Sequence, residues 1–271
     1  MTADWLELCR GVVDDLRRVL DELPGRSERE PVVGTGMGGD QTTAVDAAAE
    51  QAIVRRLEAL HADGADFTLV SEELGMRVFG RDGRRHVVVD PIDGSLNAKR
   101  GIPIFSVSVA VAEGETMGDV SFGYVYDFGT GEEWTAERDG GARLDGHRLG
   151  SVRPKDRLEI LALEATRTPS VADAAAALVG SVARLRILGS LALSLCHLAA
   201  GRVDAVASLR PARAVDIAAA QLLVRECGLV ISLPQQDDPF IAARLDVERR
   251  SRVVAAGSAE TCRTVAAALA T

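Results

Sequence analysis

The segment VVVDPIDGSLNAKRGIPIFSVSVAV places two acids, Asp90 and Asp93, three residues apart at the end of an apolar run. Pro91 fixes one backbone dihedral angle and Gly94 permits a conformation that other residues resist, so the chain can turn and bring the two carboxylates together. Neighbouring carboxylates repel and partly protonate unless a cation lies between them. Because Mg2+ prefers such oxygen ligands and keeps waters that a phosphate can displace, the spacing predicts a magnesium site. An ordinary acidic turn is the alternative interpretation.

Gly94 and Ser95 directly follow the second acid. If a short helix begins there, their backbone N–H groups point at a common position and form an anion site. We therefore expect these two residues to bind a phosphate group that the metal ions also coordinate.

Three further acids are candidates for the same site. Glu72 and Glu73 follow a short apolar strand in TLVSEEL, and Asp216 begins the otherwise apolar helix of ARAVDIAAAQLL. A lone acid entering a buried helix is costly without a partner. Two alternatives remain open, namely solvated acids in a turn for Glu72 and Glu73, and a favourable interaction with the helix dipole for Asp216.

The hydrophobic pattern of the first half predicts the elements that position these acids. Apolar residues at helical spacing predict helices over 3–22 and 42–60, and the segment 23–40 between them, with its prolines and glycines, predicts a loop. Residues 119–127 alternate like a half-buried antiparallel strand, and residues 130–146 predict a hairpin with glycine turns. The predicted strands are 67–70, 86–89, 104–112 and 119–127.

Strands and helices alternate in the second half, which is typical of α/β organisation. A boundary near residue 150 divides the chain into an N-terminal lobe, 1–150, and a C-terminal lobe, 151–271. The predicted strands are 158–163, 184–188, 203–207, 228–232 and 252–256. The predicted helices are 170–178, 190–200, 214–226 and 258–269.

Composition excludes some classes of partner. The net charge of −9 argues against a nucleic-acid surface, because phosphate backbones are bound by an excess of Lys and Arg. No segment reaches the roughly 18 apolar residues of a membrane span, and acids interrupt the apolar stripe of the N-terminal helix, unlike a signal peptide. We therefore expect no nucleic-acid partner, no membrane partner and a cytoplasmic location.

The cysteines and histidines show no metal-binding pattern. The cysteines lack a CxxC pair, which favours buried free thiols over disulfides or metal ligands. The histidines have no ligand-like spacing and are expected to be structural or exposed. These residues are Cys9, Cys196, Cys227, Cys262, His61, His86, His147 and His197.

The order of the motifs resembles the inositol monophosphatase family, particularly its archaeal-type branch with fructose-1,6-bisphosphatase activity. The matching segments cover most of the chain in the right order: GGDQTTAVDAAAE, SEE, DPIDGS, RGIPIFSVSVAVA, GYVYDFGTGEEWTAERDGGARLDG, LGSLALSLCHLAAGRVDA and VDIAAA. The resemblance implies an α+β sugar-phosphatase fold, a layered αβαβα sandwich with a mixed antiparallel N-terminal lobe and an α/β C-terminal lobe. It also implies a homodimer.

The resemblance implies a metal-binding role for each acid by position. Glu72, Asp90 and the carbonyl of Ile92 would bind one Mg2+ ion. Asp90, Asp93 and Asp216 would bind a second, and a third, weaker ion would share Glu72. The expected cofactor is therefore two to three Mg2+ ions in each active site.

The resemblance also implies which residues act on water and substrate. Asp46 and the hydroxyl of Ser95 would orient and deprotonate the attacking water; the family often has threonine at the second position. Gly189 and Ser190 match the turn that lines the substrate pocket. Metal ions would activate this water and stabilise the departing alkoxide, so no covalent intermediate is needed.

The sequence departs from the family where inositol hydroxyls are bound. Val215 replaces a common tryptophan, and SLRPAR lacks the glutamate that contacts inositol. Arginines 184, 186, 210 and 213 are candidates for a second substrate phosphate, and we select Arg186 and Arg213; solvated surface arginines are the alternative.

We therefore expect a phosphatase that hydrolyses both inositol-1-phosphate and fructose-1,6-bisphosphate. The alternatives are a 3′-phosphoadenosine 5′-phosphate phosphatase, a histidinol-phosphate phosphatase, or a family member that mainly binds a protein.

Overall fold

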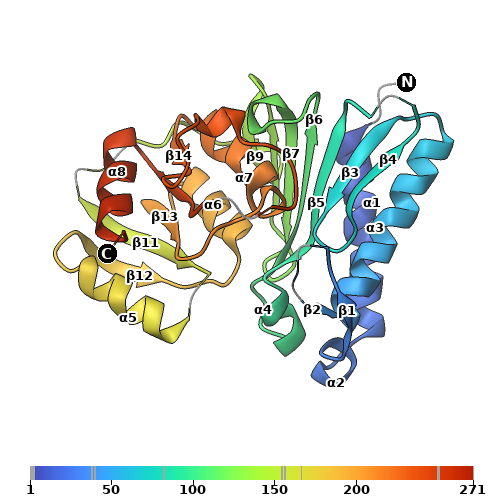
Figure 1. The fold of residues 1–271 in the computed structure, drawn as a ribbon, viewed down its shortest axis with the longest axis horizontal. Coiled ribbons are helices and arrows are strands. Elements are labelled where there is room, and N and C mark those ends of the chain that lie inside the picture. The colour runs from blue at the N-terminus through green and yellow to red at the C-terminus, as the bar shows by residue number, and fades with distance from the viewer. Residues whose placement is uncertain are drawn as a thin grey trace.

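The computed structural model describes residues 4–37, 39, 41–81, 83–153, 155, 157–165, 167–248 and 251–270. Its elements form five alternating layers, in which a pair of helices separates two sheets and each sheet is covered on its outer face by another pair (Figure 1). This is the αβαβα sandwich that we expected, so the predicted fold class is confirmed.

An eight-stranded sheet contains most of the first half of the chain. Its strand order is β10-β9-β8-β7-β6-β5-β3-β4, and all neighbours are antiparallel except β3 and β5. Because β3 and β5 are parallel, their carboxyl ends lie at the same edge of the sheet. The strands are β3 (Phe67–Ser71), β4 (Gly75–Phe79), β5 (His86–Asp93), β6 (Ser106–Ala112), β7 (Val120–Asp127), β8 (Glu133–Glu137), β9 (Gly141–Leu144) and β10 (His147–Arg148).

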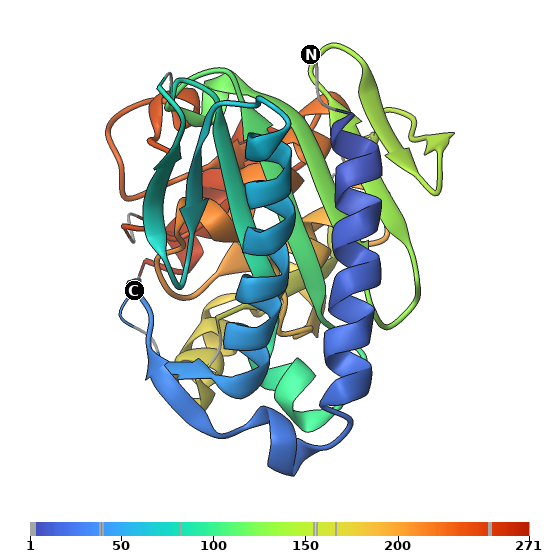
Figure 2. The same cartoon turned by 90° about the vertical axis from the view of Figure 1, so that its right-hand side faces the viewer.

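Two long helices, α1 (Trp5–Glu22) and α3 (Ala44–Ala62), cover one face of this sheet (Figure 2). Val87 and Val89 of β5 belong to the core beneath them, whereas Val88 belongs to the core on the opposite face. The run VVV is therefore buried on both faces of the sheet, as a continuous apolar strand requires. The buried stripe of α1 consists of Cys9, Val12, Val13, Leu16 and Val19.

Helices α6 (Leu191–Ala199) and α7 (Ala214–Glu226) form the central layer between the two sheets. Every residue of α6 is buried except His197, and most of α7 is buried as well. A helix that is apolar on all sides is stable only when it is packed on all sides. Asp216 lies in the first turn of α7, at one end of this apolar layer.

A five-stranded sheet with the order β12-β11-β13-β15-β14 forms the other half of the sandwich. β11 is parallel to β12 and β13, whereas β15 is antiparallel to β13 and β14. Helices α5 (Thr168–Ala177) and α8 (Ala259–Ala268) cover its outer face. The strands are β11 (Leu158–Glu164), β12 (Val182–Arg186), β13 (Ala205–Ser208), β14 (Val230–Ser232) and β15 (Val254–Ala256).

The predicted loop at 23–40 is partly wrong, because it contains regular structure. A short helix, α2 (Arg26–Arg29), is followed by β1 (Val32–Thr35), which pairs with β2 (Gln41–Thr43). All four residues of β1 are exposed, so no burial pattern marks the strand in the sequence. The remaining short elements are α4 (Ser95–Arg100) and two 3-10 turns, η1 (Met117–Asp119) and η2 (Phe240–Ala242).

The prediction that residues 119–127 form a half-buried strand is also wrong. All residues of β7 except Ser121 are buried, because α1 packs on one face of the strand and α7 on the other. The other predicted elements are present with ends shifted by at most two residues, except β5, which extends to Asp93. The boundary near residue 150 stays a prediction. Among the described residues, no helix combines the length and the apolar character needed to cross a membrane.

Candidate metal and phosphate site

Asp90 and Asp93 both lie on β5, where its pairing with β6 is irregular. Asp90 is opposite Ser108 and Asp93 is opposite Ser106, so three steps along β5 match two along β6. This is a β-bulge. Side chains three positions apart on a regular strand point to opposite faces, and the bulge removes that constraint from the two acids.

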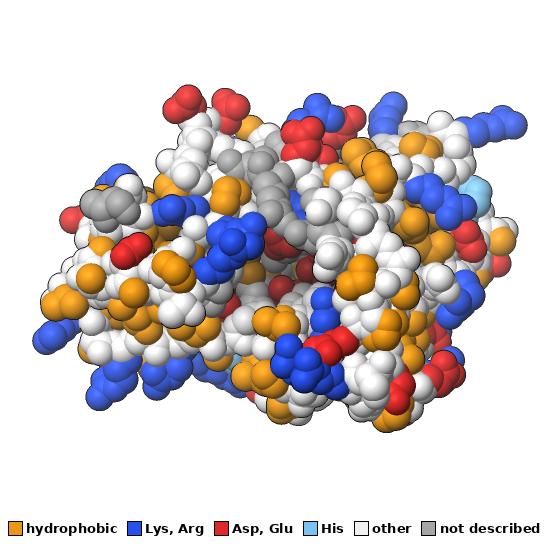
Figure 3. Space-filling view, turned by 60° about the horizontal axis from the view of Figure 1, so that its bottom comes forward, with side chains coloured by type: hydrophobic (Ala, Val, Ile, Leu, Met, Phe, Trp, Pro, Cys, Tyr) orange, Lys and Arg blue, Asp and Glu red, His pale blue; other side chains and the backbone are white. Residues whose placement is uncertain are grey.

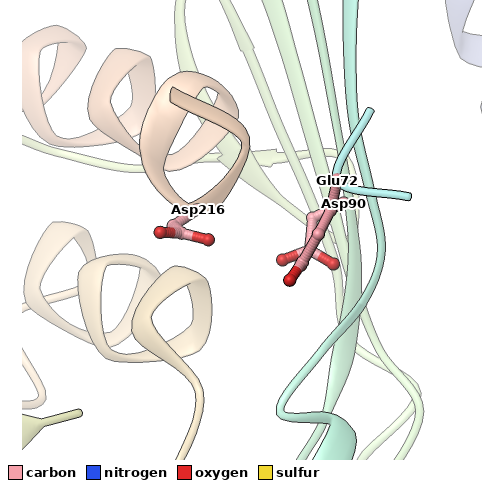
Figure 4. Close-up of side chains that lie close together, drawn as sticks. All are labelled: Glu72, Asp90 and Asp216. Atoms are coloured by element: carbon pink, nitrogen blue, oxygen red, sulfur yellow. The ribbon is translucent and has the colours of Figure 1, made fainter. Parts of the chain in front are cut away.

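Three acids from three different elements converge at this edge of the sheet. Glu72 directly follows β3, Asp90 lies on the parallel neighbour β5, and Asp216 belongs to the first turn of α7. Each offers one carboxylate oxygen, and these oxygens all lie within 4.8 Å of one another (Figure 4). This is the one group of His, Cys, Asp and Glu side chains with metal-binding proximity among the residues that the structure describes.

The electrostatics of this group favour a bound cation. Burial, and then the charges of Glu72, Asp93 and Asp216, hold the pKa of Asp90 well above its ordinary value, although Arg213 lowers it. Burial likewise raises the pKa of Asp93 from 3.8 to about 6. Hard divalent cations prefer clustered carboxylate oxygens and would neutralise this repulsion, so the donor set fits Mg2+.

Asp93 points at the N-terminus of α6. Its carboxylate accepts hydrogen bonds from the Ser190 hydroxyl, from the backbone N–H of Ala192 at 2.8 Å and from that of Leu191 at 3.3 Å. A negative charge is favourable at a helix N-terminus. Asp93 also lies near the converging acids, since its charge raises the pKa of Asp90 and it lines one cavity together with Asp216. Its proposed role as a metal ligand stays a prediction.

Gly94 and Ser95 form the start of α4, as expected. Gly94 has a φ of 92°, and a side chain there would approach the carbonyl oxygens of Gly189 and Ile104 to 3.1 Å, so only glycine fits without strain. The Ser95 hydroxyl donates to the carbonyl of Ile92 at 2.8 Å. The structure thus brings together the predicted water-orienting hydroxyl and the predicted carbonyl ligand.

Asp46 lies in the first turn of α3 and is 7% exposed. Its Oδ2 accepts hydrogen bonds from the backbone N–H of Thr43 at 3.1 Å and from the Thr43 hydroxyl at 2.5 Å. Lys99 Nζ lies 3.6 Å from the same oxygen. Among the described residues, Asp46 makes no direct hydrogen bond to Ser95, and the two residues are predicted to share a water.

A cavity of about 190 Å3 borders Asp93 and Asp216 on the side of the second sheet. Gly189 lines it with a φ of 85°. Acidic side chains are visible inside a hollow of the surface, with Lys and Arg side chains around it (Figure 3). The cavity is also lined by Glu164, Ala165, Leu191, Ser208, Arg210, Pro211 and Ala212.

The candidate arginines lie in different surroundings. Arg213 is buried, and its guanidinium pairs with Glu72 at 2.8 Å, within the acid cluster. Arg186 is exposed and donates to the carbonyl of Leu185. Arg210, which we did not select from the sequence, lines the cavity, whereas Arg184 pairs with surface Glu159 at 3.6 Å.

Glu164 is a site residue that sequence reasoning missed. It ends β11, is 1% exposed and accepts hydrogen bonds from the backbone N–H groups of Leu188 and Gly189 and from the Ser194 hydroxyl. It thereby holds the turn that leads into α6. Burial raises its pKa from 4.5 to about 7. An acid ending the apolar run LEILALE was the available signal, as it was at Asp90.

Glu50 was missed as well. It lies one turn after Asp46 on α3 and is 5% exposed, and the Ser71 hydroxyl lies 2.5 and 2.6 Å from its two carboxylate oxygens. Because Ser71 directly precedes Glu72, this contact ties α3 to the strand end that positions a metal-site acid. Burial raises the pKa of Glu50 to about 7.

Comparisons with known proteins give matches that cover most of the chain. A model of the inositol monophosphatase family matches residues 7–270. A fructose-1,6-bisphosphatase/inositol-1-monophosphatase of Methanothermobacter thermautotrophicus is 34% identical over 269 residues, covering 94% of this chain and 93% of that protein. A Nus factor SuhB of Pasteurella multocida is 36% identical over 195 residues, covering 70% of each. Among solved structures, an inositol monophosphatase-fructose 1,6-bisphosphatase has a TM-score of 0.83 and 28% identity and covers 98% of this chain and 100% of that one.

Proposed function

The chain belongs to the inositol monophosphatase family, and we propose from that premise that it is a metal-dependent phosphatase of small sugar or cyclitol phosphates. The observation that carries this proposal is the convergence of Glu72, Asp90 and Asp216, whose ligand oxygens lie within 4.8 Å of one another. No nucleophilic side chain is needed for this chemistry.

Two to three Mg2+ ions are the proposed cofactor. Glu72, Asp90 and the Ile92 carbonyl would hold one, and Asp90, Asp93 and Asp216 would hold the second. When bound, such ions lower the pKa of coordinated water and stabilise charge on the phosphoryl oxygens and the departing alkoxide.

The backbone and side chains of this chain do the remaining work. We assign the phosphate to the N–H groups of Gly94 and Ser95, which directly follow Asp93 at the start of α4. Asp46 and the Ser95 hydroxyl orient the water for in-line attack. Gly189 and Ser190 line the substrate side, and Glu164 holds that turn in place.

We propose inositol-1-phosphate and fructose-1,6-bisphosphate as substrates. The archaeal relatives named for both activities support this pair. For the second phosphate of the bisphosphate we favour Arg210, because it lines the cavity beside Asp216. Arg186 precedes the turn at Gly189 and is the other candidate. Arg213 pairs with Glu72 and is better assigned to the acid cluster.

A role in protein binding is the second candidate, and the similarity to a Nus factor SuhB is the observation that favours it.

We further propose a cytoplasmic homodimer. The four cysteines are buried free thiols, which is compatible with a reducing compartment. Light scattering on a gel-filtration column measures the mass in solution.

Phosphate release from a panel of substrates tests the proposed function. The panel contains inositol-1-phosphate, fructose-1,6-bisphosphate, 3′-phosphoadenosine 5′-phosphate and histidinol phosphate, each with Mg2+ and with EDTA, and Asp216→Asn serves as the inactive control. The expected result is turnover of the first two substrates in Mg2+ and no turnover in EDTA. Turnover only of the third or fourth substrate would identify an alternative phosphatase. No turnover, together with an unchanged fold, would favour the protein-binding role.

A further inference from the structure

Lys99 is a cation at the acid that we assign to the reacting water. Its Nζ lies 3.6 Å from Asp46 Oδ2, and the two side chains are only 19% and 9% exposed. Shielding from solvent strengthens such an ion pair relative to an exposed one. No motif in the sequence marked Lys99 as part of the site.

The two oxygens of Asp46 have different surroundings. Oδ2 accepts both hydrogen bonds from Thr43 and lies beside the Lys99 ammonium group. Oδ1 is buried and has no hydrogen-bond partner within the described part of the chain. Because buried polar atoms nearly always bond to protein or water, Oδ1 is the oxygen with capacity for a water molecule.

The helix that carries Lys99 is fixed from several sides. Arg29 donates to the carbonyl of Ala98 at 2.8 Å, and Arg100 pairs with Glu30 at 2.6 Å. The Asn97 amide bonds to the carbonyls of Ile104 and Leu188, both at 2.8 Å. The ammonium group therefore extends from a rigid base.

Lys99 is also on the same side of α4 as Ser95, the other residue assigned to the water, because residues four apart on a helix share a face.

We propose that Lys99 is a positioning residue for Asp46. Lys99 pairs with Asp46 Oδ2, which also accepts the hydrogen bonds from Thr43. Asp46 Oδ1 is then the oxygen that accepts a hydrogen bond from the attacking water. This inference rests on the proposed phosphatase function and adds a residue that acts on turnover rather than on substrate binding.

Lys99→Met removes the charge and keeps most of the side-chain volume. We expect kcat to fall about ten- to hundredfold, because the lost ion pair is better shielded than an exposed pair and less shielded than a fully buried one, while KM changes by less than about twofold. Lys99→Arg keeps a cation and should recover most of the turnover. Lys155→Met is the matched control, since it removes the other lysine of the chain, whose carboxylate partner at 2.8 Å is Asp204 rather than Asp46.

A double-mutant cycle separates positioning from general damage. In an Asp46→Asn background the Lys99→Met change should lower the residual kcat by less than about threefold, because its target is already altered. Mg2+ affinity by calorimetry and the folded secondary structure by circular dichroism should be the same for Lys99→Met and the wild type.

Each contrary result has a distinct meaning. The same loss in both backgrounds, or a large rise in KM, would overturn the proposal and place Lys99 on the phosphate itself. An active wild type with an unaffected Lys99→Met would refute this inference alone. A wild type without Mg2+-dependent phosphate release would refute the proposed function as well.

Discussion

Replacing Asp90 by asparagine should stabilise the metal-free protein and weaken its response to Mg2+. Asp90 is 4% exposed, and one of its oxygens lies within 4.8 Å of oxygens of Glu72 and Asp216. At an effective dielectric constant of about 20, two unit charges 4.8 Å apart repel by about 3.5 kcal/mol. The metal-free protein therefore carries a repulsion that the substitution removes.

Two effects reduce this gain. Arg213 attracts the acids of the cluster, and the raised pKa of Asp90 means that part of the repulsion is relieved by proton binding. We expect a net stabilisation of about 1–3 kcal/mol without metal, which raises the melting temperature of a chain of this size by about 2–5 °C.

The assay is thermal unfolding of both proteins in EDTA and in saturating Mg2+. A cation that binds only the folded state stabilises it by mass action, so the wild type should gain much more from Mg2+ than Asp90→Asn does. Asp14→Asn, at an exposed position of α1, is the control and should leave the melting temperature unchanged both in EDTA and in Mg2+. A lower melting temperature of Asp90→Asn in EDTA, with an undiminished gain from Mg2+, would refute the reasoning.

The other expected outcomes concern turnover, substrate choice and pH. Asp46→Asn should lower kcat far more than Mg2+ affinity, because its proposed task is to orient water; equal losses in kinetics and calorimetry would place it among the metal ligands. Arg210→Ala should lower kcat/KM for fructose-1,6-bisphosphate about ten- to hundredfold, the equivalent of about 1.5–3 kcal/mol, and spare inositol-1-phosphate. Arg184→Ala is the control, and equal losses of Arg210→Ala on both substrates would contradict the assignment. Without metal, the wild type should lose stability as the pH rises from about 4.5 to 7, and Glu164→Gln should lose less. Its folded pKa of about 7 lies above the ordinary 4.5, so the folded state keeps a proton that the unfolded state loses, and stability falls as pH rises through that window. The same dependence of melting temperature on pH in Glu164→Gln and the wild type would contradict the proposed role of Glu164.

The layers of the fold were predictable because burial dictates the period of apolar residues. The stripe of α1 and the apolar runs of β5 and β6 are buried as their patterns require. The edge strand β4 was missed because its middle residues, Met76 to Val78, are exposed, so no burial constrains their pattern.

β7 shows why its alternation was misinterpreted. In VSFGYVYD the alternation is between large and small residues, not between buried and solvated ones. Phe122, Tyr124 and Tyr126 pack toward α1 and α3. Gly123 points the other way, where a side chain would come within 2.6 Å of the carbonyl oxygen of Ala219 in α7. A small residue in a tight helix contact and a small residue facing water look alike in one sequence.

The acids of the candidate site were predictable because carboxylates at the ends of apolar strands are unusual on their own. Their partners were not predictable, since each contact joins distant segments. Glu164 acts on a turn 24 residues away, as its hydrogen bond to the Leu188 N–H shows. Lys99 likewise meets Asp46 only because α4 packs near the start of α3, and Arg210 faces the cavity only because of the path of the chain after β13.

The position of a bound metal ion is the most direct test of the proposed metal site. Crystals of the wild type grown with Mn2+ in place of Mg2+ give an anomalous diffraction signal at each ion. We expect a peak coordinated by the carboxylates of Glu72, Asp90 and Asp216. An enzyme that turns over substrate with Mn2+ but shows no peak at these three residues would contradict it.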